Sequence, residues 1–307
     1  MKFGKLQDIS QVNFELPPSP PANAALLEGR SPVGADFQFY TGCTGWSMTE
    51  WVGKWYPKGT KAKDFLHHYS RQFNTIEFNT THYRIPTPEQ VQKWCAQVPE
   101  DFRFCPKVPQ RISHSQNLGL GTDQLPFFWQ SLEEMGTFLG ACFMQLPPYF
   151  EFDRLADLER FLRAWPAAFP LAVELRHPSW FDSEDHIDEW SALFAALNIA
   201  TVITDVAGRR DVLHQRLTST MTMIRFVGNG LHPTDYERIR AWCHQLEAWR
   251  ELGLETVYFF PHEPDNLLAP EMTEFLVQYL HESTTIITRG PTPIPDKPEE
   301  GAQISLF

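Results

Sequence analysis

Cysteine is scarce in this sequence, and its positions are scattered. No CxxC pair and no closely spaced histidine accompany the five cysteines, which are Cys43, Cys95, Cys105, Cys142 and Cys243. A disulfide framework or a zinc site would need ligands at regular, short spacing. The pattern therefore favours reduced cytosolic thiols over either alternative.

Long hydrophobic runs are also lacking. No run of about 18 apolar residues occurs, and the first ten residues, MKFGKLQDIS, contain no apolar signal region. We therefore expect a soluble cytoplasmic protein without a membrane partner.

Basic residues are in deficit. The chain has 26 Lys and Arg against 38 Asp and Glu, which gives a net charge of −12. A protein that coats nucleic acid through bulk electrostatics needs a basic surface, so this class of function is disfavoured. The count still leaves room for a locally basic cleft.

Proline, in contrast, is concentrated at the two ends. Residues 1–36 include PPSPPANAALLEGRSP, and residues 286–307 include PTPIPDKPEEGAQ. Because proline fixes a backbone angle and lacks an N–H donor, both ends are predicted to be extended and poorly packed. Residues 37–285 are predicted to form the one folded domain, and the 42% apolar residues of the chain are enough for a sizeable core.

Short apolar runs alternate with longer amphipathic ones inside this domain. Strands are predicted at 37–43, 75–78, 102–107, 140–146, 171–175, 199–205, 221–227 and 255–260, with helical patterns between them. This alternation is typical of an α/β fold with a parallel sheet. Eight units of this size predict a single (β/α)₈ barrel of the TIM type. An open doubly wound sheet is the alternative, although the chain has no GxGxxG fingerprint.

The stretch AVELRHPSWF, at 172–181, places charge on a predicted strand. Side chains alternate along a strand, so Glu174 and Arg176 share one face. Burying such groups is costly unless they are paired or solvated. The pair is therefore either an internal ion pair or part of a site that uses charge.

The other predicted strands, except the first, also end in polar residues. In chain order these residues are Glu77 with Asn79, Lys107, Gln145, Glu174 with Arg176, Asp205, Arg225, and His262 before Glu263. Their apolar neighbours, such as Ile76 and Phe78, would face the helices. In a barrel the carboxyl ends of the strands carry the active site, so we expect these residues to converge.

The residue types of this ring suit acid/base chemistry on an anion. Lys107, Arg176 and Arg225 could bind phosphate, since guanidinium groups bind it bidentately. The expected general acids or bases are Glu77, Glu174, Asp205 and, on the loop 108–126, His114. For His114 the alternative is an exposed histidine without a catalytic role.

The remaining candidates are expected to bind the substrate; they are Trp46, Asn79, Tyr83, Gln145, Trp180 and His262. Trp46 and Trp180 could stack on a base or sugar, or could instead fill the rim of the barrel. A divalent metal held by Glu77, Glu174, Asp205 and His262 is a second chemical option. Three cations in the ring oppose it electrostatically, so no cofactor is expected.

Several segments together resemble the YecE-like family, domain of unknown function 72. They are TGCTGWSMTEWVGKWYP (41–57), FNTIEFNTTHYRIP (73–86), DFRFCPKVPQRISH (101–114), QLPPYF (145–150) and VELRHPSWF (173–181). The resemblance covers about 40–280 and implies a TIM-barrel fold. It places at the family's signature positions Gly45, Trp46, Tyr56, Glu77, Asn79, Tyr83, Lys107, His114, Gln145, Glu174, Arg176, Trp180 and Arg225. The chain departs from the family at His82, where an aromatic residue is usual, and at Pro261 and His262, where relatives carry an Asn-Asn pair.

The last five residues resemble the clamp-binding pentapeptide of bacterial replication and repair proteins. In such a peptide Gln303, Ile304, Leu306 and Phe307 would contact the sliding clamp, with the leucine and phenylalanine in an apolar pocket. The alternative is that the tail folds back and packs Phe307 on the barrel.

Two functions are therefore expected. The first is an enzyme, a hydrolase or lyase, that acts on a phosphate-bearing nucleotide or nucleic acid, with DNA maintenance as its expected context. The second is a non-catalytic adaptor that binds an anion and is tethered to a partner through the C-terminal tail.

Overall fold

The structure, a computed structural model, describes residues 4–28 and 37–295. Within them, strands alternate with helices as the sequence predicts. The strands are β1 (Gln38–Thr41), β2 (Thr75–Phe78), β3 (Arg103–Pro106), β4 (Cys142–Gln145), β5 (Leu171–Glu174), β6 (Ala200–Asp205), β7 (Met221–Val227) and β8 (Thr256–His262). Each predicted range overlaps one strand, and β8 continues past its predicted end to His262.

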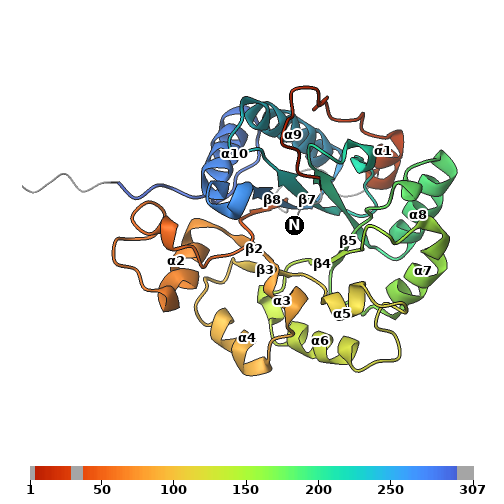
Figure 1. The fold of residues 1–307 in the computed structure, drawn as a ribbon, viewed down its shortest axis with the longest axis horizontal. Coiled ribbons are helices and arrows are strands. Elements are labelled where there is room, and N and C mark those ends of the chain that lie inside the picture. Colours follow the sequence, from red (N-terminus) through yellow and green to blue (C-terminus); the bar gives the residue numbers. More distant parts are fainter. Residues whose placement is uncertain (1–3, 29–36, 296–307) are drawn as a thin grey trace, which may run out of the picture.

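The α-helices surround the strands, as Figure 1 shows. They are α1 (Pro21–Leu27), α2 (Phe65–Gln72), α3 (Thr80–Tyr83), α4 (Pro88–Cys95), α5 (Gln110–Ser113), α6 (Gln124–Glu133), α7 (Leu155–Ala164), α8 (Glu184–Ala196), α9 (Pro233–Leu252) and α10 (Ala269–Ser283). No helix of the described residues is both long enough and apolar enough to cross a membrane.

The bounds of α9 follow from its local sequence. Pro233 occupies the first turn, where a missing N–H costs nothing. The carboxylate of Asp235 accepts a hydrogen bond from the backbone N–H of His232 at 2.8 Å, which caps the helix start. The helix ends at Leu252 and is followed by Gly253, whose φ of 112° is a left-handed conformation that favours glycine.

The strands pair in parallel in two sheets. One has the order β1-β8-β7-β6-β5-β4, and the other contains β2 and β3. Among the described residues, the strands do not form the one continuous ladder of eight that a closed barrel would have. Between β3 and β4 only isolated bridges occur, at Phe104–Leu139 and Lys107–Phe143.

Side chains take the place of a backbone ladder between β1 and β2. The Asn74 amide accepts from the N–H of Thr41 at 2.8 Å and donates to the carbonyl of Phe39 at 2.9 Å. The Tyr69 hydroxyl lies between the same strands, where it accepts from the N–H of Cys43 at 2.7 Å and donates to the carbonyl of Thr75 at 2.9 Å. Sequence rules for strand pairing do not predict such inserted side chains. The ladder stops here because these side chains take the hydrogen bonds that the two backbones would otherwise exchange.

An apolar cluster lies among the strands, separate from the clusters under the helices. Its buried members are Tyr40, Cys105, Ala141, Phe143, Ala172, Ala200, Val202, Met223, Tyr258 and Phe260. All the strands except β2 contribute residues to this cluster. The residues that alternate with them along the strands face the helices. Ile76 and Phe78, for example, pack in the cluster beneath α2 and α4. The strands therefore share one apolar core, and the inward-facing side chains at the strand ends lie just beyond it.

The prediction of poorly packed ends is wrong for the described residues. Leu27 and Asn23, in α1, are almost fully buried, and the Asn23 amide donates to the carbonyl of Gln215 at 2.7 Å. At the other end, Ile286 is buried, and the backbone N–H of Ile294 donates to the carbonyl of Lys54 at 2.7 Å. The proline-rich composition sets the backbone shape of these segments, but their apolar and amide side chains still pack on the domain.

Candidate functional site

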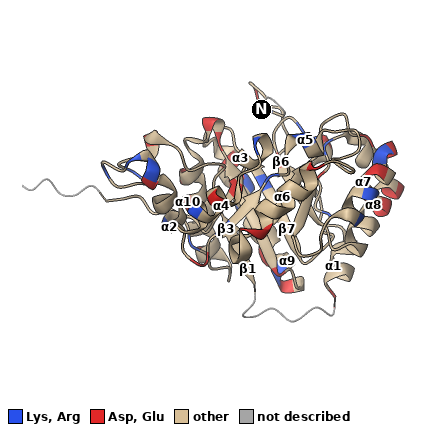
Figure 2. Ribbon diagram, turned by 90° about the horizontal axis from the view of Figure 1, so that it is seen from below, with Lys and Arg blue, Asp and Glu red and all other residues tan. Residues whose placement is uncertain are grey.

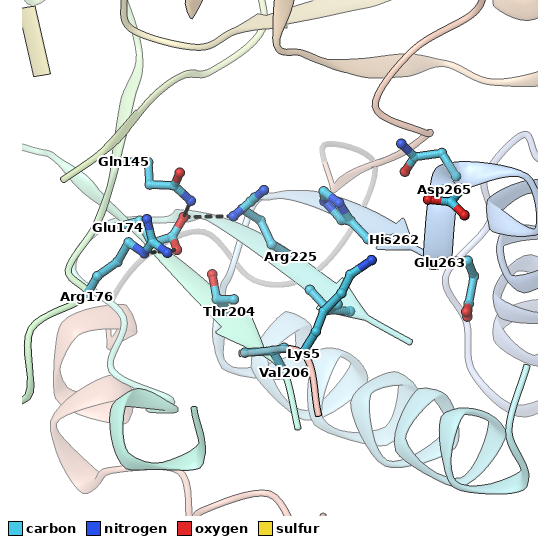
Figure 3. Close-up of a pocket in the computed structure, with 12 residues that line it drawn as sticks. Lys5, Gln145, Glu174, Arg176, Thr204, Val206, Arg225, His262, Glu263 and Asp265 are labelled. Carbon is cyan, nitrogen blue, oxygen red and sulfur yellow. Dashed lines mark hydrogen bonds and ion pairs between the residues drawn. The ribbon is translucent and has the colours of Figure 1, made fainter. Parts of the chain in front are cut away.

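A cavity of about 240 Å³ lies at the carboxyl ends of the strands. We call it the strand-end cavity. Strands β4 to β8 contribute side chains to it that include Gln145, Glu174, Thr204, Arg225 and His262, and Arg176 follows β5 (Figure 3). Seen from the side, other charged residues gather at the periphery on α7 and α8 (Figure 2). The strand-end cavity is therefore a polar site within an otherwise apolar centre.

A chain of hydrogen bonds leads from Lys107 to the wall of the cavity. The Lys107 ammonium donates to the side-chain oxygen of Gln145 at 3.0 Å. The Gln145 amide donates to Oε2 of Glu174 at 2.8 Å, and Nη1 of Arg225 donates to the same oxygen at 3.0 Å. Residues from four strands are thus joined in one network.

Glu77 ends this network. Arg225 binds it bidentately, with Nε at 2.9 Å from Oε2 and Nη2 at 3.1 Å from Oε1. The Asn79 amide donates to Oε1 at 2.9 Å, and Nε2 of His262 lies 2.7 Å from Oε2. Such charge-assisted bonds are the strongest of the protein hydrogen bonds, and here they hold a carboxylate that is wholly buried.

The network fixes the charges of its members. Burial alone would raise the pKa of Glu77, but Arg225 and His262 outweigh it and hold that pKa well below its usual range. Burial likewise opposes ionisation of Glu174, and Arg225 followed by Arg176 lowers its pKa. Both carboxyls are therefore ionised at neutral pH. Burial and the neighbouring Arg225 lower the pKa of Lys107 to about 8.

Arg176 and Thr204 complete the wall near Glu174. Nε of Arg176 lies 3.7 Å from Oε1 of Glu174, and the guanidinium lines the cavity. Thr204 is paired in register with Arg225 and so faces the same side. Among the described residues its buried hydroxyl has no hydrogen-bond partner.

Asp205 does not lie at this site, contrary to expectation. Its carboxylate accepts hydrogen bonds from Arg238 at 2.9 Å and from the Trp242 indole at 2.8 Å, and it also pairs with Arg210. Arg238 and Trp242 are one turn apart on α9, so Asp205 faces the helix. Its role is to join β6 to α9.

The two tryptophans expected to bind substrate pack among apolar side chains outside the cavity. Trp46 stacks on Phe78 with ring centroids 5.3 Å apart, in the cluster that faces the helices. Trp180 is fully buried, and its indole donates to the carbonyl of Phe150 at 2.8 Å. Neither lines the strand-end cavity. Both indoles take part in apolar packing in this structure.

His114 and Tyr83 line a different hollow, of about 350 Å³. The His114 ring lies 5.6 Å from that of His82, and Tyr83 is 77% exposed. Burial, then Lys107 and Arg176, lower the pKa of His114, so it is neutral at pH 7. The structure does not bring these two residues into the strand-end cavity.

A metal site from Glu77, Glu174, Asp205 and His262 is not assembled, since Asp205 faces α9. Among residues 4–28 and 37–295, no group of three or more His, Cys, Asp or Glu side chains could hold a metal ion. The expected clamp-binding residues Gln303, Ile304, Leu306 and Phe307 lie outside the described residues.

Lys5 and Thr204 are among the residues of the cavity that were not predicted from the sequence, whereas Glu263 was expected at the end of the last strand. Glu263 follows β8, and burial together with Asp235 raises its pKa to about 7. The alternation of Val202 and Thr204 against Ile203 and Asp205 was a usable signal for Thr204. No signal in the sequence placed Lys5, because it lies in a segment that was predicted to be unpacked.

Comparisons with known proteins agree on the family. The model of the family described as "Protein of unknown function DUF72" matches residues 40–298. The UPF0759 protein YecE of Escherichia coli K12 is 30% identical over 262 residues, which cover 80% of this chain and 93% of that protein. YecE of Escherichia coli O157:H7 gives the same values.

Solved structures show the same fold. A crystal structure of a DUF72 family protein from Enterococcus faecalis V583, at 3.10 Å resolution, has a TM-score of 0.66 and 18% identity, and the match covers 84% of this chain and 100% of that one. A second crystal structure from that organism, at 2.52 Å, has a TM-score of 0.64 and 19% identity, with 80% and 98% covered. The family model and the identity to YecE both span most of the chain, which therefore belongs to the DUF72 family.

Proposed function

We propose that this protein is an enzyme that performs acid/base chemistry on a phosphate-bearing substrate, a nucleotide or nucleic acid, in the strand-end cavity. The observation that carries the proposal is the hydrogen-bonded network from Lys107 to His262, of which Glu174, Arg225 and His262 line the cavity. Structural ion pairs alone would not need an adjoining cavity. Titratable groups of opposite charge beside a cavity are typical of active sites.

We further propose that the two sheets together form a (β/α)₈ barrel of the TIM type. The spatial order of the strands supports it, because β1 pairs with β8, and β3 touches β4 through two bridges. The backbone N–H of Glu77 also donates to the carbonyl of Cys43 at 3.1 Å, which links β2 to the end of β1. In such a barrel the strand-end cavity occupies the position of the active site.

His262 is the group best placed to transfer a proton. Its Nε2 faces the ionised carboxylate of Glu77 at 2.7 Å, so a neutral imidazole carries its hydrogen on Nε2. Nδ1 is then the acceptor that is available to a substrate. Glu77 acts as a positioning residue, as carboxylates do for catalytic histidines.

Arg176 and Arg225 supply the positive charge that would attract a phosphate. Arg225 is occupied by Glu77 and Glu174, so it acts mainly through its charge. Arg176 lines the cavity 3.7 Å from Glu174, and a guanidinium has the fork geometry that binds a phosphate bidentately. We therefore assign phosphate binding mainly to Arg176.

The test is phosphate binding by an Arg176→Ala variant. Calorimetric titration of the full chain with inorganic phosphate should show binding that is at least about tenfold weaker than in the wild type. Arg163→Ala, which removes an exposed arginine of α7, is the matched control and should bind normally. Equal phosphate affinity in wild type and Arg176→Ala would contradict the proposed site.

We also propose a partner, the bacterial sliding clamp, on the sequence of residues 303–307 alone. A terminal Leu-Phe pair can fill an apolar pocket, and a proline-rich tether lets it reach a partner. Tethering would bring an acidic protein to DNA without a basic surface. This partner fits both a DNA-maintenance enzyme and the non-catalytic adaptor.

Deletion of residues 303–307 should abolish clamp binding in a titration of purified clamp with the full chain. A Leu306→Ala, Phe307→Ala double variant should behave like the deletion, because these two side chains supply the apolar contact. An Ile294→Ala variant of the full chain is the control and should still bind. Binding that survives the deletion, or is absent from the full chain, would count against the partner.

A further inference from the structure

The N-terminal residues 4–17 run across the chain segments that follow β6 and β7; we call them the N-terminal strap. The N–H of Gly208 donates to the carbonyl of Gly4 at 2.8 Å, and Nη2 of Arg210 donates to the carbonyl of Glu15 at 2.9 Å. The Phe14 ring lies 4.7 Å from the guanidinium carbon of Arg238. Figure 1 shows this segment, in dark red, passing beside α9 to α1. The strap is thus bound along its length.

The strap carries Lys5 to the strand-end cavity. The Lys5 side chain lines that cavity, and in Figure 3 it extends toward the space in front of Arg225 and His262. A second cavity, of about 420 Å³, lies under the strap, and Lys5, Val206 and Val227 line both. The strap therefore forms the outer wall between two adjoining cavities.

Lys5 differs from the other cations of the site. Arg225 is bound to Glu77 and Glu174, and Lys107 donates to Gln145. Within residues 4–28 and 37–295, Lys5 forms neither a hydrogen bond nor an ion pair. Its ammonium group needs no rearrangement of a protein ion pair before it binds a ligand.

We propose that Lys5 is a ligand-binding residue that the N-terminal strap adds to the strand-end cavity, where its ammonium group binds the phosphate of the ligand. This inference rests on the proposed function, since it assumes a phosphate-bearing ligand in that cavity. The cavity under the strap holds the part of the ligand that extends beyond the phosphate. The family model matches only from residue 40, so the strap lies outside the matched region.

Gly208 allows the strap to be displaced without a change in any residue that lines either cavity. A Cβ at this position would lie 2.8 Å from the carbonyl oxygen of Gly4 and 3.0 Å from its carbonyl carbon. Both are backbone atoms, so the strap would have to move. Gly208→Ala therefore tests the placement of Lys5 rather than its charge.

The experiment is calorimetric titration of the full chain with inorganic phosphate. Lys5→Gln should weaken binding roughly tenfold, because one charge contact in a partly buried site is lost. Lys5→Arg should retain affinity. Gly208→Ala should weaken binding to a similar extent, and the Lys5→Gln, Gly208→Ala double variant should bind no more weakly than Lys5→Gln. Lys61→Gln, which removes an exposed lysine distant in sequence from the strap, should bind like the wild type.

The outcomes separate this inference from the proposed function. If Lys5→Gln binds like the wild type while Arg176→Ala does not, the role of Lys5 is overturned and the site stands. A loss of affinity in Lys61→Gln equal to that in Lys5→Gln would show a bulk charge effect. A Gly208→Ala variant with normal affinity would show that the strap does not place Lys5. Either result overturns the inference. If the wild type does not bind phosphate, the proposed function fails and this inference fails with it.

Discussion

Replacing Arg225 with methionine is expected to lower the free energy of unfolding by about 3–5 kcal/mol at pH 7, because two carboxylates would stay buried without their counter-ion. Glu77 is fully buried and Glu174 is 2% exposed, so water cannot take over the role of the guanidinium. Arg225 donates two hydrogen bonds to Glu77 and one to Glu174, and all three are lost together.

The cost of this substitution should depend on pH. In the wild type, Arg225 lowers the pKa of both carboxyls below the ordinary value of 4.5. Their ionised form therefore contributes stability above that value, and this contribution is lost as the pH falls through the folded-state pKa values. In Arg225→Met, burial would raise both pKa values, so the carboxyls would take up protons more readily. The difference in stability between wild type and variant should therefore shrink as the pH falls below 4.5.

The free energy of unfolding and its dependence on pH are measured by urea unfolding of wild type, Arg225→Met and Arg225→Lys at several pH values. The lysine variant keeps the charge but cannot bind two carboxylates in fork geometry, so an intermediate loss is expected. Arg163→Met is the control, since its pair with Glu159 is exposed and should contribute no more than about 1 kcal/mol. A loss in Arg225→Met no larger than in this control would show that the ion pairs do not support the fold.

Strand-end parity was enough to find most of the site from the sequence. Glu77, Lys107, Gln145, Glu174 and Arg225 each lie at the end of an apolar run, and the alternation of side chains decides which way they face. The alternation of side chains along parallel strands therefore brings residues that are far apart in the sequence to the same place in the fold. Glu174 and Arg225, which are 51 positions apart, lie within hydrogen-bond distance for this reason.

The same reasoning failed for Asp205 because it selected the last residue of β6 without asking which face of the strand that residue occupies. Thr204 pairs in register with Arg225, which leaves Asp205 on the side of α9. The partners Arg238 and Trp242 gave a signal, since a buried arginine and an indole on one helix face both need an acceptor. Only the three-dimensional packing shows that they share the same one.

The N-terminal strap and the junctions between the sheets were beyond sequence reasoning. The strap is held mainly by bonds to backbone carbonyls, such as those of Gly4 and Glu15, which any residue type can provide. Asn74 and Tyr69 act in the same way between β1 and β2. Interactions of this kind depend on where distant segments meet, and local composition does not encode that.

Turnover is expected to fall by about 100-fold or more in His262→Gln, because a positioned general base contributes that much to a rate. Glutamine keeps a side-chain N–H that can donate to Glu77, but it cannot accept a proton. The fold and the binding of inorganic phosphate should therefore change little. This combination separates a role in proton transfer from a role in binding or stability.

The measurement is hydrolysis of p-nitrophenyl phosphate and bis(p-nitrophenyl) phosphate by the full chain at neutral pH. The wild type should hydrolyse at least one of these esters, and His262→Gln should do so at least about 100-fold more slowly. Replacing His244, an exposed histidine of α9 that lines neither cavity, with glutamine is the matched control and should leave the rate unchanged. A His262→Gln variant with wild-type turnover would remove the imidazole from the mechanism. If the wild type hydrolyses neither ester yet still binds phosphate at Arg176, the non-catalytic adaptor becomes the better description, because the cavity would then hold an anion without transforming it.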